Sequence, residues 1–350
     1  MNSTELKSHF YKRFSGEHGM MVFSQAGLPC SLLGYINTDH TCAISTALSM
    51  RIRLIARAIG SRSITITSTS TDMQRIYRID SSDNRDRISS FLQRASRYKL
   101  KGSEILYDST IPDFYDPHIA YTAAVINAVF DVSKVKRPPY GEMVNLCADR
   151  NERNAYSTEF CHREGYAVCV DNDSVRNIPL PMTGYKFVTV SVREKHTSLS
   201  QKSIDKTFSE LKELFPHISS FSDIDDDMLQ KAAHNFKSHS VNMLLRHLKS
   251  ESKRVKDGER ALSACNTEKF AEIMKESFLS QKHLCDYNDT RVFLGDKILA
   301  HSGVKGARMC ELGIIAIVDE ESCDSLIRDV RFDYEREFGY PPLFCVTKGL

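Results

Sequence analysis

The order of apolar segments along the chain is the strongest constraint on its fold. Continuous or alternating apolar runs, which are typical of strands, occupy residues 64–67, 166–170, 187–192, 314–318 and 343–346. Between the third and fourth runs, apolar residues recur at helical spacing instead, within 204–215, 243–248 and 270–278. Asn266 precedes the last stripe and is predicted to cap that helix. Strands and long helices without regular βαβ alternation predict an α+β fold.

The length of the chain predicts two domains. Its 350 residues, 41% hydrophobic and 26% charged, can bury a full core and correspond to about two domains. Prolines and a glycine interrupt the pattern at 178–185, just before the strand at 187–192. We therefore expect an N-terminal domain over residues 1–183 and a C-terminal domain over residues 184–350.

Charge and hydropathy exclude some classes of partner. The net charge is +2 with both signs interspersed, so neither a general nucleic-acid surface nor a membrane surface is expected. The apolar runs are too short to span a bilayer and the first residues lack a signal-peptide pattern, which predicts a cytoplasmic protein. The basic run Lys134 to Arg137 could be a nuclear-localisation patch, but a solvated linker is the favoured interpretation.

The ten cysteines are scattered without a CxxC pair, which predicts reduced, mostly buried thiols. Two other groups, Cys161-His162 and His283 with Cys285 and Asp286, have no companion pair at metal-ligand spacing. We therefore predict no metal site.

Several short motifs occur in a characteristic order. In the C-terminal half these are Arg246-His247 with Glu251 and Arg254, then 270–277, Asp286-Tyr287, and Gly-Ala-Arg-Met at 306–309 before an apolar strand. In the N-terminal half they are 10–14, 26–34, Thr38-Asp39-His40 and 164–171. This series resembles the motifs of galactokinases, so the chain is identified as a divergent member of the galactokinase branch of the GHMP kinase superfamily.

The resemblance implies a two-domain α+β GHMP kinase-like fold, with a ribosomal protein S5 domain 2-like N-terminal domain and a ferredoxin-like C-terminal domain. In that family a strand, the phosphate-binding loop GLSSSAAL and a helix separate the counterparts of the helices at 120–130 and 143–147. Here only the linker 133–141 joins them, a deficit on the order of forty residues. We therefore expect a shortened N-terminal domain without the phosphate loop. The hydroxyl-rich run 68–71 lacks flanking glycines and is expected to be a turn.

The resemblance also implies where catalytic residues should lie. The family's catalytic arginine aligns with Pro29, and its catalytic aspartate aligns with Ala155. Proline has no charge and alanine has no proton acceptor, so no catalytic residue is predicted. Glu152 or Glu159 could substitute after a register shift, but solvated helix carboxylates are the favoured interpretation.

One position of the family's sugar-binding motif is retained. Asp39 matches the motif's aspartate, whereas Tyr35 and Ile36 or Asn37 replace its glutamate and histidine. Asp39 is therefore a sugar-binding candidate, and a turn-capping aspartate is the equal alternative. Arg308 is predicted to support packing rather than catalysis.

These observations favour a catalytically inactive galactokinase-like protein. It would be a binding or regulatory module, a sugar sensor or a developmental regulator, with a protein or a small sugar as partner and no cofactor. The alternative is an active ATP-dependent galactokinase or N-acetylgalactosamine kinase that uses Mg-ATP at an incomplete or rebuilt nucleotide site. A lost exon would explain the missing loop, but not Pro29, Ala155 and the short connection after Met309 together. A decaying gene product is a third interpretation, against which the intact amphipathic stripes argue.

Overall fold

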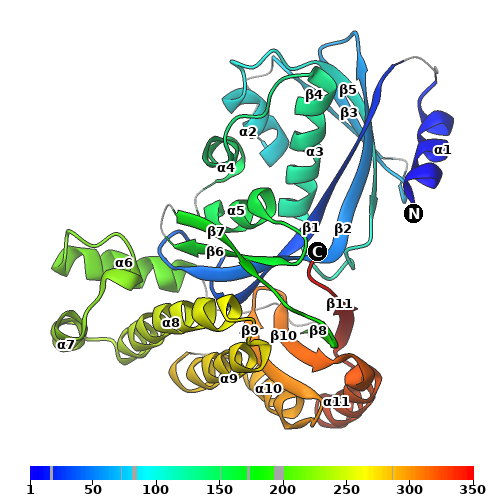
Figure 1. Ribbon diagram of the computed structural model, residues 1–350. Helices are drawn as coiled ribbons and strands as arrows, with labels where there is room; N and C mark the ends of the chain where they lie inside the picture. The colour runs from blue at the N-terminus through cyan, green and yellow to red at the C-terminus, as the bar shows by residue number, and fades with distance from the viewer. Residues whose placement is uncertain are drawn as a thin grey trace. The chain divides into compact units, whose positions relative to one another are not determined.

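The computed structural model describes residues 1–15, 19–71, 73–80, 85–149, 151–171, 174–192, 201–285 and 287–350. Two compact units form, one from residues 1–29 and 49–149 and the other from residues 30–48 and 150–350. Both units contain helices and strands, which confirms the α+β prediction (Figure 1). The two units do not follow the proposed boundary between residues 183 and 184, and that domain division stays a prediction.

The first unit is built on a sheet in which β4, β3, β5 and β2 are neighbours in that order and β1 pairs with β2. β3 and β5 are parallel, whereas β4–β3 and β2–β5 are antiparallel. The strands are β1 (Met21–Gly34), β2 (Ala43–Ile59), β3 (Ser63–Ser68), β4 (Gln74–Arg78) and β5 (Gly102–Ser109). β1 and β2 are long enough to continue into the second unit.

Helices cover both faces of this sheet. They are α1 (Ser3–Arg13), α2 (Arg87–Arg94), α3 (His118–Ser133) and α4 (Tyr140–Cys147). In Figure 1, α2, α3 and α4 lie on one face and α1 lies on the other. α3 is buried along most of its length because alanine, valine and isoleucine occupy nearly every face. Its position places the connection between β5 and α3, residues 110–117, at the edge of a cavity in this unit.

The second unit contains β6 (Tyr166–Asp171) and β7 (Ser174–Pro179), which continue the same seven-stranded sheet, and a separate four-stranded sheet. The first residues of β2 pair with β6, which pairs with β7. The other sheet is antiparallel, in the order β11, β8, β10 and β9. Its strands are β8 (Tyr185–Ser191), β9 (Val304–Cys310), β10 (Gly313–Asp319) and β11 (Leu343–Thr347). All five strand predictions are therefore confirmed, as β3, β6, β8, β10 and β11.

The helices of the second unit form two cores. Against the β8–β11 sheet pack the apolar faces of α9, α10 and α11, and a separate cluster joins α6, α7 and α8. The bounds are α5 (Arg153–Cys161), α6 (Gln201–Leu214), α7 (Asp226–Asn235), α8 (His239–Ser263), α9 (Thr267–Leu284), α10 (Asp289–Ala300) and α11 (Cys323–Phe338), with 3₁₀ turns at Phe221–Asp223 and Glu320–Ser322. The stripes predicted as helical lie on α6, α8 and α9. Asn266 caps α9 as predicted, since its Oδ1 accepts the Lys269 N–H at 2.9 Å.

Among the helices that the structure describes, none combines the length and hydropathy needed to cross a bilayer.

Candidate functional site

The C-terminal motif residues meet in a buried network in the second unit. Glu251 on α8 and Arg308 on β9 are 2% and 0% exposed, and the Arg308 Nη2 lies 3.4 Å from the Glu251 Oε1. Arg254 donates to the other carboxylate oxygen at 2.7 Å. Ser277 bridges the ion pair, because its hydroxyl donates to Glu251 and accepts from the Arg308 Nε. Two guanidinium groups offset burial of the Glu251 carboxylate, so its pKa is lowered to about 2.

This network holds the turn that follows β1. The Gly34 N–H donates to Glu251 at 2.9 Å, and the Gly34 carbonyl accepts from Arg308 at 2.9 Å. Gly34 has φ +69°, and an added Cβ would lie 2.0 Å from the Cys42 carbonyl oxygen. Only glycine fits there. The retained motif residues Glu251 and Arg308 therefore stabilise the backbone that leads to Asp39, and the structure places Arg308 in packing, as predicted.

The Tyr35 side chain is buried in the same part of the second unit. Its hydroxyl lies 2.7 Å from the His247 Nε2 and accepts from the Gln281 amide at 3.1 Å. Burial lowers the pKa of His247 to about 4, so the imidazole is neutral near pH 7. The neutral imidazole shares one hydrogen bond with the Tyr35 hydroxyl through Nε2 and another with the Ser280 hydroxyl through Nδ1, at 2.8 Å. Tyr35 aligns with the family's sugar-binding glutamate. Its hydroxyl is hydrogen-bonded to side chains of its own unit.

Asp39 lies in a different environment from Tyr35. Its Oδ2 accepts the backbone N–H of Asn151 at 3.1 Å, and the Asn151 side chain donates to the Asp205 Oδ2 at 3.0 Å. Asn151 thus bridges the carboxylates of the 34–41 turn and of α6. It has φ +71°, a conformation that asparagine tolerates better than most residues. The proposed turn-capping role falls to Thr38, whose hydroxyl accepts the His40 N–H at 3.4 Å.

The second oxygens of these carboxylates are enclosed by protein. The Oδ1 atoms of Asp39 and Asp205, and that of Asn37, have no hydrogen-bond partner within the described part of the chain. A buried acceptor without a donor is costly, so such atoms point to a hydroxyl-bearing ligand or to water. Asn154 fixes the turn below them, since its amide donates to the carbonyls of Thr38 and Thr41 at 2.8 and 3.0 Å. Sequence analysis missed Asp205 and Asn151.

The two positions that align with the family's catalytic residues carry side chains without an ionisable group. Pro29 is buried within β1, and Ala155 is 7% exposed on α5. Glu152 at the N-cap of α5 and Glu159 within this helix are both partly buried. Tyr156, next to Ala155 on α5, is fully buried and stacks on Phe160.

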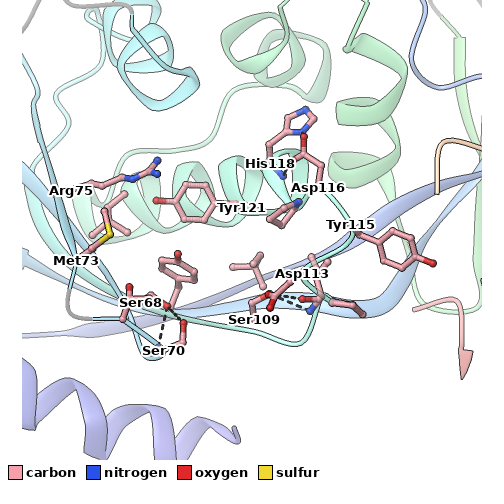
Figure 2. A pocket seen from close by; sticks show the side chains of 17 residues that line it. Ser68, Ser70, Met73, Arg75, Ser109, Asp113, Tyr115, Asp116, His118 and Tyr121 are labelled. Atoms are coloured by element: carbon pink, nitrogen blue, oxygen red, sulfur yellow. Dashed lines mark hydrogen bonds and ion pairs between the residues drawn. The ribbon is translucent and has the colours of Figure 1, made fainter. Parts of the chain in front are cut away.

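The first unit has its own cavity, of about 540 Å³, at the start of α3. Figure 2 shows Tyr121 extending towards Arg75, with Asp116 and His118 at the first turn of the helix. Tyr107 packs edge-on against Tyr121, with ring centroids 5.1 Å apart. The cavity lining comprises Ile52, Ile66, Ser68, Ser70, Thr71, Met73, Arg75, Tyr107, Ser109, Ile111, Pro112, Asp113, Tyr115, Asp116, Pro117, His118 and Tyr121.

The start of α3 is poorly suited to an anion. Free N–H groups and the helix dipole make a helix N-terminus a phosphate site. Here Pro117 at the N-cap has no N–H, and the Asp116 carboxylate accepts the His118 N–H at 3.0 Å. The Asp116 carboxylate also contacts the His118 ring at 2.8 Å, and this bond lowers the pKa of Asp116. Asp113 adds a second carboxylate, so two acidic side chains lie beside the start of this helix.

The predicted gap between α3 and α4 is occupied by a short connection, residues 134–139. A strand, loop and helix do occur one step earlier, as β5, residues 110–117 and α3. Ser68 and Ser70 lie beside them with their hydroxyls 2.8 Å apart, as expected for a turn. Residues 110–117 contain no glycine, so they do not resemble the family's glycine-containing phosphate loop in sequence.

Within the described ranges, no three histidine, cysteine, aspartate or glutamate side chains gather as metal ligands do. Asp286, considered with His283 and Cys285 and as part of the Asp-Tyr motif, lies outside the described residues.

Comparison with known proteins relates part of this sequence to galactokinases. No family model matches the sequence. A galactokinase of Halalkalibacterium halodurans is 25% identical over 201 residues, which are 53% of this chain and 50% of that protein. A galactokinase of Streptococcus mutans is 31% identical over 153 residues, 41% of this chain and 38% of that protein. The matches thus span half or less of these relatives.

The structural matches cover nearly the whole chain. Lactococcus lactis galactokinase complexed with galactose superimposes with a TM-score of 0.81 and 18% identity over 99% of this chain and 97% of that one. Methanococcus jannaschii mevalonate kinase gives a TM-score of 0.61 and 15% identity over 96% and 100%. The chain is thus similar in sequence to galactokinases over about half of its length, and it has the α+β fold of galactokinase and mevalonate kinase.

Proposed function

We propose that this chain is a non-phosphorylating galactokinase relative that binds a small sugar of the galactose class. The observation that supports this most directly is the pair of enclosed oxygens on Asp39 and Asp205, held in place through Asn151. Carboxylate oxygens accept hydrogen bonds from hydroxyl groups, and these charge-assisted bonds are stronger than neutral ones. A neutral polyol that reaches these enclosed atoms, after the surrounding side chains move, could satisfy both without bringing a charge into the site.

The choice of galactose rests on the relatives. The Lactococcus galactokinase was crystallised with galactose, and Asp39 is the one position of the sugar motif that this chain retains. N-acetylgalactosamine is the second ligand to test, because it keeps most of the same hydroxyl groups. We propose that such a sugar-binding protein acts in sensing or regulation, together with a protein partner that responds to the sugar.

Three features argue against phosphoryl transfer. Transfer requires donors around the phosphates and a group that orients or deprotonates the acceptor hydroxyl. Pro29 and Ala155 occupy the aligned catalytic positions, and the Asp116 carboxylate takes up an N–H at the start of α3. We therefore derive no step through Mg-ATP.

The test is calorimetric titration of the full-length protein with galactose, N-acetylgalactosamine and glucose. Asp39→Asn and Asp205→Asn should each weaken galactose binding by about 10- to 100-fold, since a hydrogen bond to a charged group contributes roughly 1.5–3 kcal/mol. Glu213→Gln, a solvent-exposed change on α6, is the matched control and should leave binding unchanged. Absence of binding by all three sugars to a folded protein would refute the proposal.

An active sugar kinase is the second candidate, because the sequence relatives are galactokinases. Incubation with Mg-ATP and each sugar, followed by ³¹P NMR, separates the two proposals. A sugar phosphate that forms in the wild type would establish the kinase. Sugar binding without product and without ATP binding supports the non-phosphorylating protein.

A further inference from the structure

Two cysteines distant in sequence meet in the core of the second unit. Cys30 lies near the end of β1 and Cys310 is the last residue of β9. Their sulfur atoms are 3.8 Å apart and hydrogen-bonded, across 280 sequence positions. The two residues are 0% and 5% exposed. Van der Waals contact between two thiols leaves less than about 2 Å to close before a disulfide length of roughly 2.05 Å is reached.

The next residue on each side strengthens this contact. Ser31 donates its backbone N–H and its hydroxyl to the two carboxylate oxygens of Glu311, at 2.7 and 2.6 Å. Consecutive residues of β1 thus bind consecutive residues of the turn between β9 and β10, and we call residues 30, 31, 310 and 311 the thiol clasp. Gly313 fixes that turn at φ +111°, where an added Cβ would lie 2.3 Å from the Val190 carbonyl oxygen. The clasp therefore holds the two sulfurs at a defined position.

Two of the other buried cysteines contact oxygen, as the Cys30 thiol also does with the Ser31 carbonyl oxygen at 3.8 Å. The Cys42 thiol lies 3.9 Å from the Ser252 carbonyl oxygen, and the Cys323 thiol lies 3.7 Å from that of Asp319. Burial of a thiol therefore does not by itself bring a second sulfur into contact with it.

We propose that Cys30 and Cys310 are an oxidisable dithiol, which hydrogen peroxide converts into a disulfide that locks the clasp. In the first step the Cys310 sulfur attacks one peroxide oxygen, the O–O bond breaks, and Cys310 becomes a sulfenic acid as one water leaves. The Cys30 sulfur then attacks the sulfenic sulfur, an S–S bond forms, and a second water leaves. The two thiols lose two hydrogens and two electrons, and the peroxide is reduced to two waters.

The order of these steps follows from the surroundings. Cys310 retains a small exposed area, whereas Cys30 has none. Burial raises the pKa of the Cys30 thiol well above its usual range, so Cys30 is a poor first nucleophile. It acts only as the resolving thiol, once its neighbour is oxidised. Oxidation is therefore expected to be slower than at Cys265, which is exposed.

The disulfide would restrain the 34–41 turn and would also stabilise the protein. Arg308 donates to Ser31 within the clasp and to the Gly34 carbonyl in the turn. A cross-link between positions so far apart restricts the unfolded chain, so the thermal midpoint should rise by several degrees, on the order of 5 °C. This inference does not depend on whether the chain binds a sugar.

The experiment treats the full-length protein with hydrogen peroxide, removes the peroxide, unfolds the chain and alkylates the remaining thiols. Non-reducing peptide mapping by mass spectrometry then identifies the linked cysteines. We expect one cross-linked pair that contains Cys30 and Cys310, is reversed by dithiothreitol, and accompanies the higher midpoint. Cys310→Ser should abolish the pair, and Cys323→Ser, a second buried cysteine, should preserve it.

The mapping of the wild-type protein decides the question even if Cys310→Ser fails to fold. Recovery of Cys30 and Cys310 as alkylated thiols, in a sample whose Cys265 has been oxidised, would overturn the proposal. A sulfinic acid at Cys310 without a link to Cys30 would overturn it equally.

Discussion

Replacement of Glu251 by glutamine tests whether the retained motif residues stabilise this fold through buried charge. The carboxylate is 2% exposed and offsets the guanidinium of Arg308, which is 0% exposed, and that of Arg254. Glutamine keeps the shape but leaves both cations without an anion. Loss of one partner of a buried ion pair costs about 3–5 kcal/mol, so the free energy of unfolding should fall by that amount.

The pH dependence gives the same interaction an independent signature. The pKa of Glu251 is about 2 in the folded protein and 4.5 in an unperturbed glutamate. A depressed folded-state pKa stabilises the protein above the unfolded pKa, and that stabilisation is lost as pH falls from about 4.5 towards 2. The difference corresponds to about 3 kcal/mol at neutral pH. The stability gap between wild type and Glu251→Gln should therefore narrow over this range.

The assay is urea unfolding of both proteins between pH 7 and pH 3, monitored by circular dichroism. Glu276→Gln on α9 is the matched control, because Glu276 is exposed and one residue away from Ser277. Its free energy of unfolding should stay within about 0.5 kcal/mol of the wild type. A loss below about 1 kcal/mol for Glu251→Gln, or a gap that does not change with pH, would show that the buried pair contributes little.

Three further predictions concern the turn that carries Asp39. Gly34→Ala should destabilise the protein by more than about 3 kcal/mol in urea unfolding, because its Cβ would clash with the Cys42 carbonyl at positive φ; a stable variant would contradict this geometry. Tyr35→Phe should cost about 1–3 kcal/mol through the unsatisfied His247 Nε2, and should leave galactose affinity within about twofold, since the hydroxyl faces the interior. Asn154→Ala should lower both stability and galactose affinity in thermal and calorimetric titrations, because its amide donates to two carbonyls of the turn. Unchanged galactose affinity would show that the turn does not contribute to the sugar site.

Local patterns in the sequence predicted many elements correctly. The strands β3, β6, β8, β10 and β11 and the helices α6, α8 and α9 follow from periodicity, and the Asn266 cap follows from its side-chain chemistry. The two longest strands were missed. β1 contains Gly27 and Pro29, and β2 mixes alanine, serine and arginine with its apolar residues, so neither shows a clean strand period. Their stability comes from pairing with other strands, which no local pattern records.

The candidate site was predicted only in part. Asp39 was found because its motif resembles that of galactokinases. Asn151 and Asp205 were not, because Asn151 bonds to positions 112 and 54 residues away and no motif links them.

The sequence by itself determined the mixture of helices and strands, the order of the motifs and the absence of charge at Pro29 and Ala155. Only the tertiary structure decided what the retained polar residues do. Periodicity and capping act within a few residues, whereas a buried polar group must find its hydrogen-bond partner wherever the folded chain brings one. For this reason Glu251, Arg308 and Tyr35 became interior supports, and Asp39 and Asp205 were left with oxygens that a ligand could satisfy.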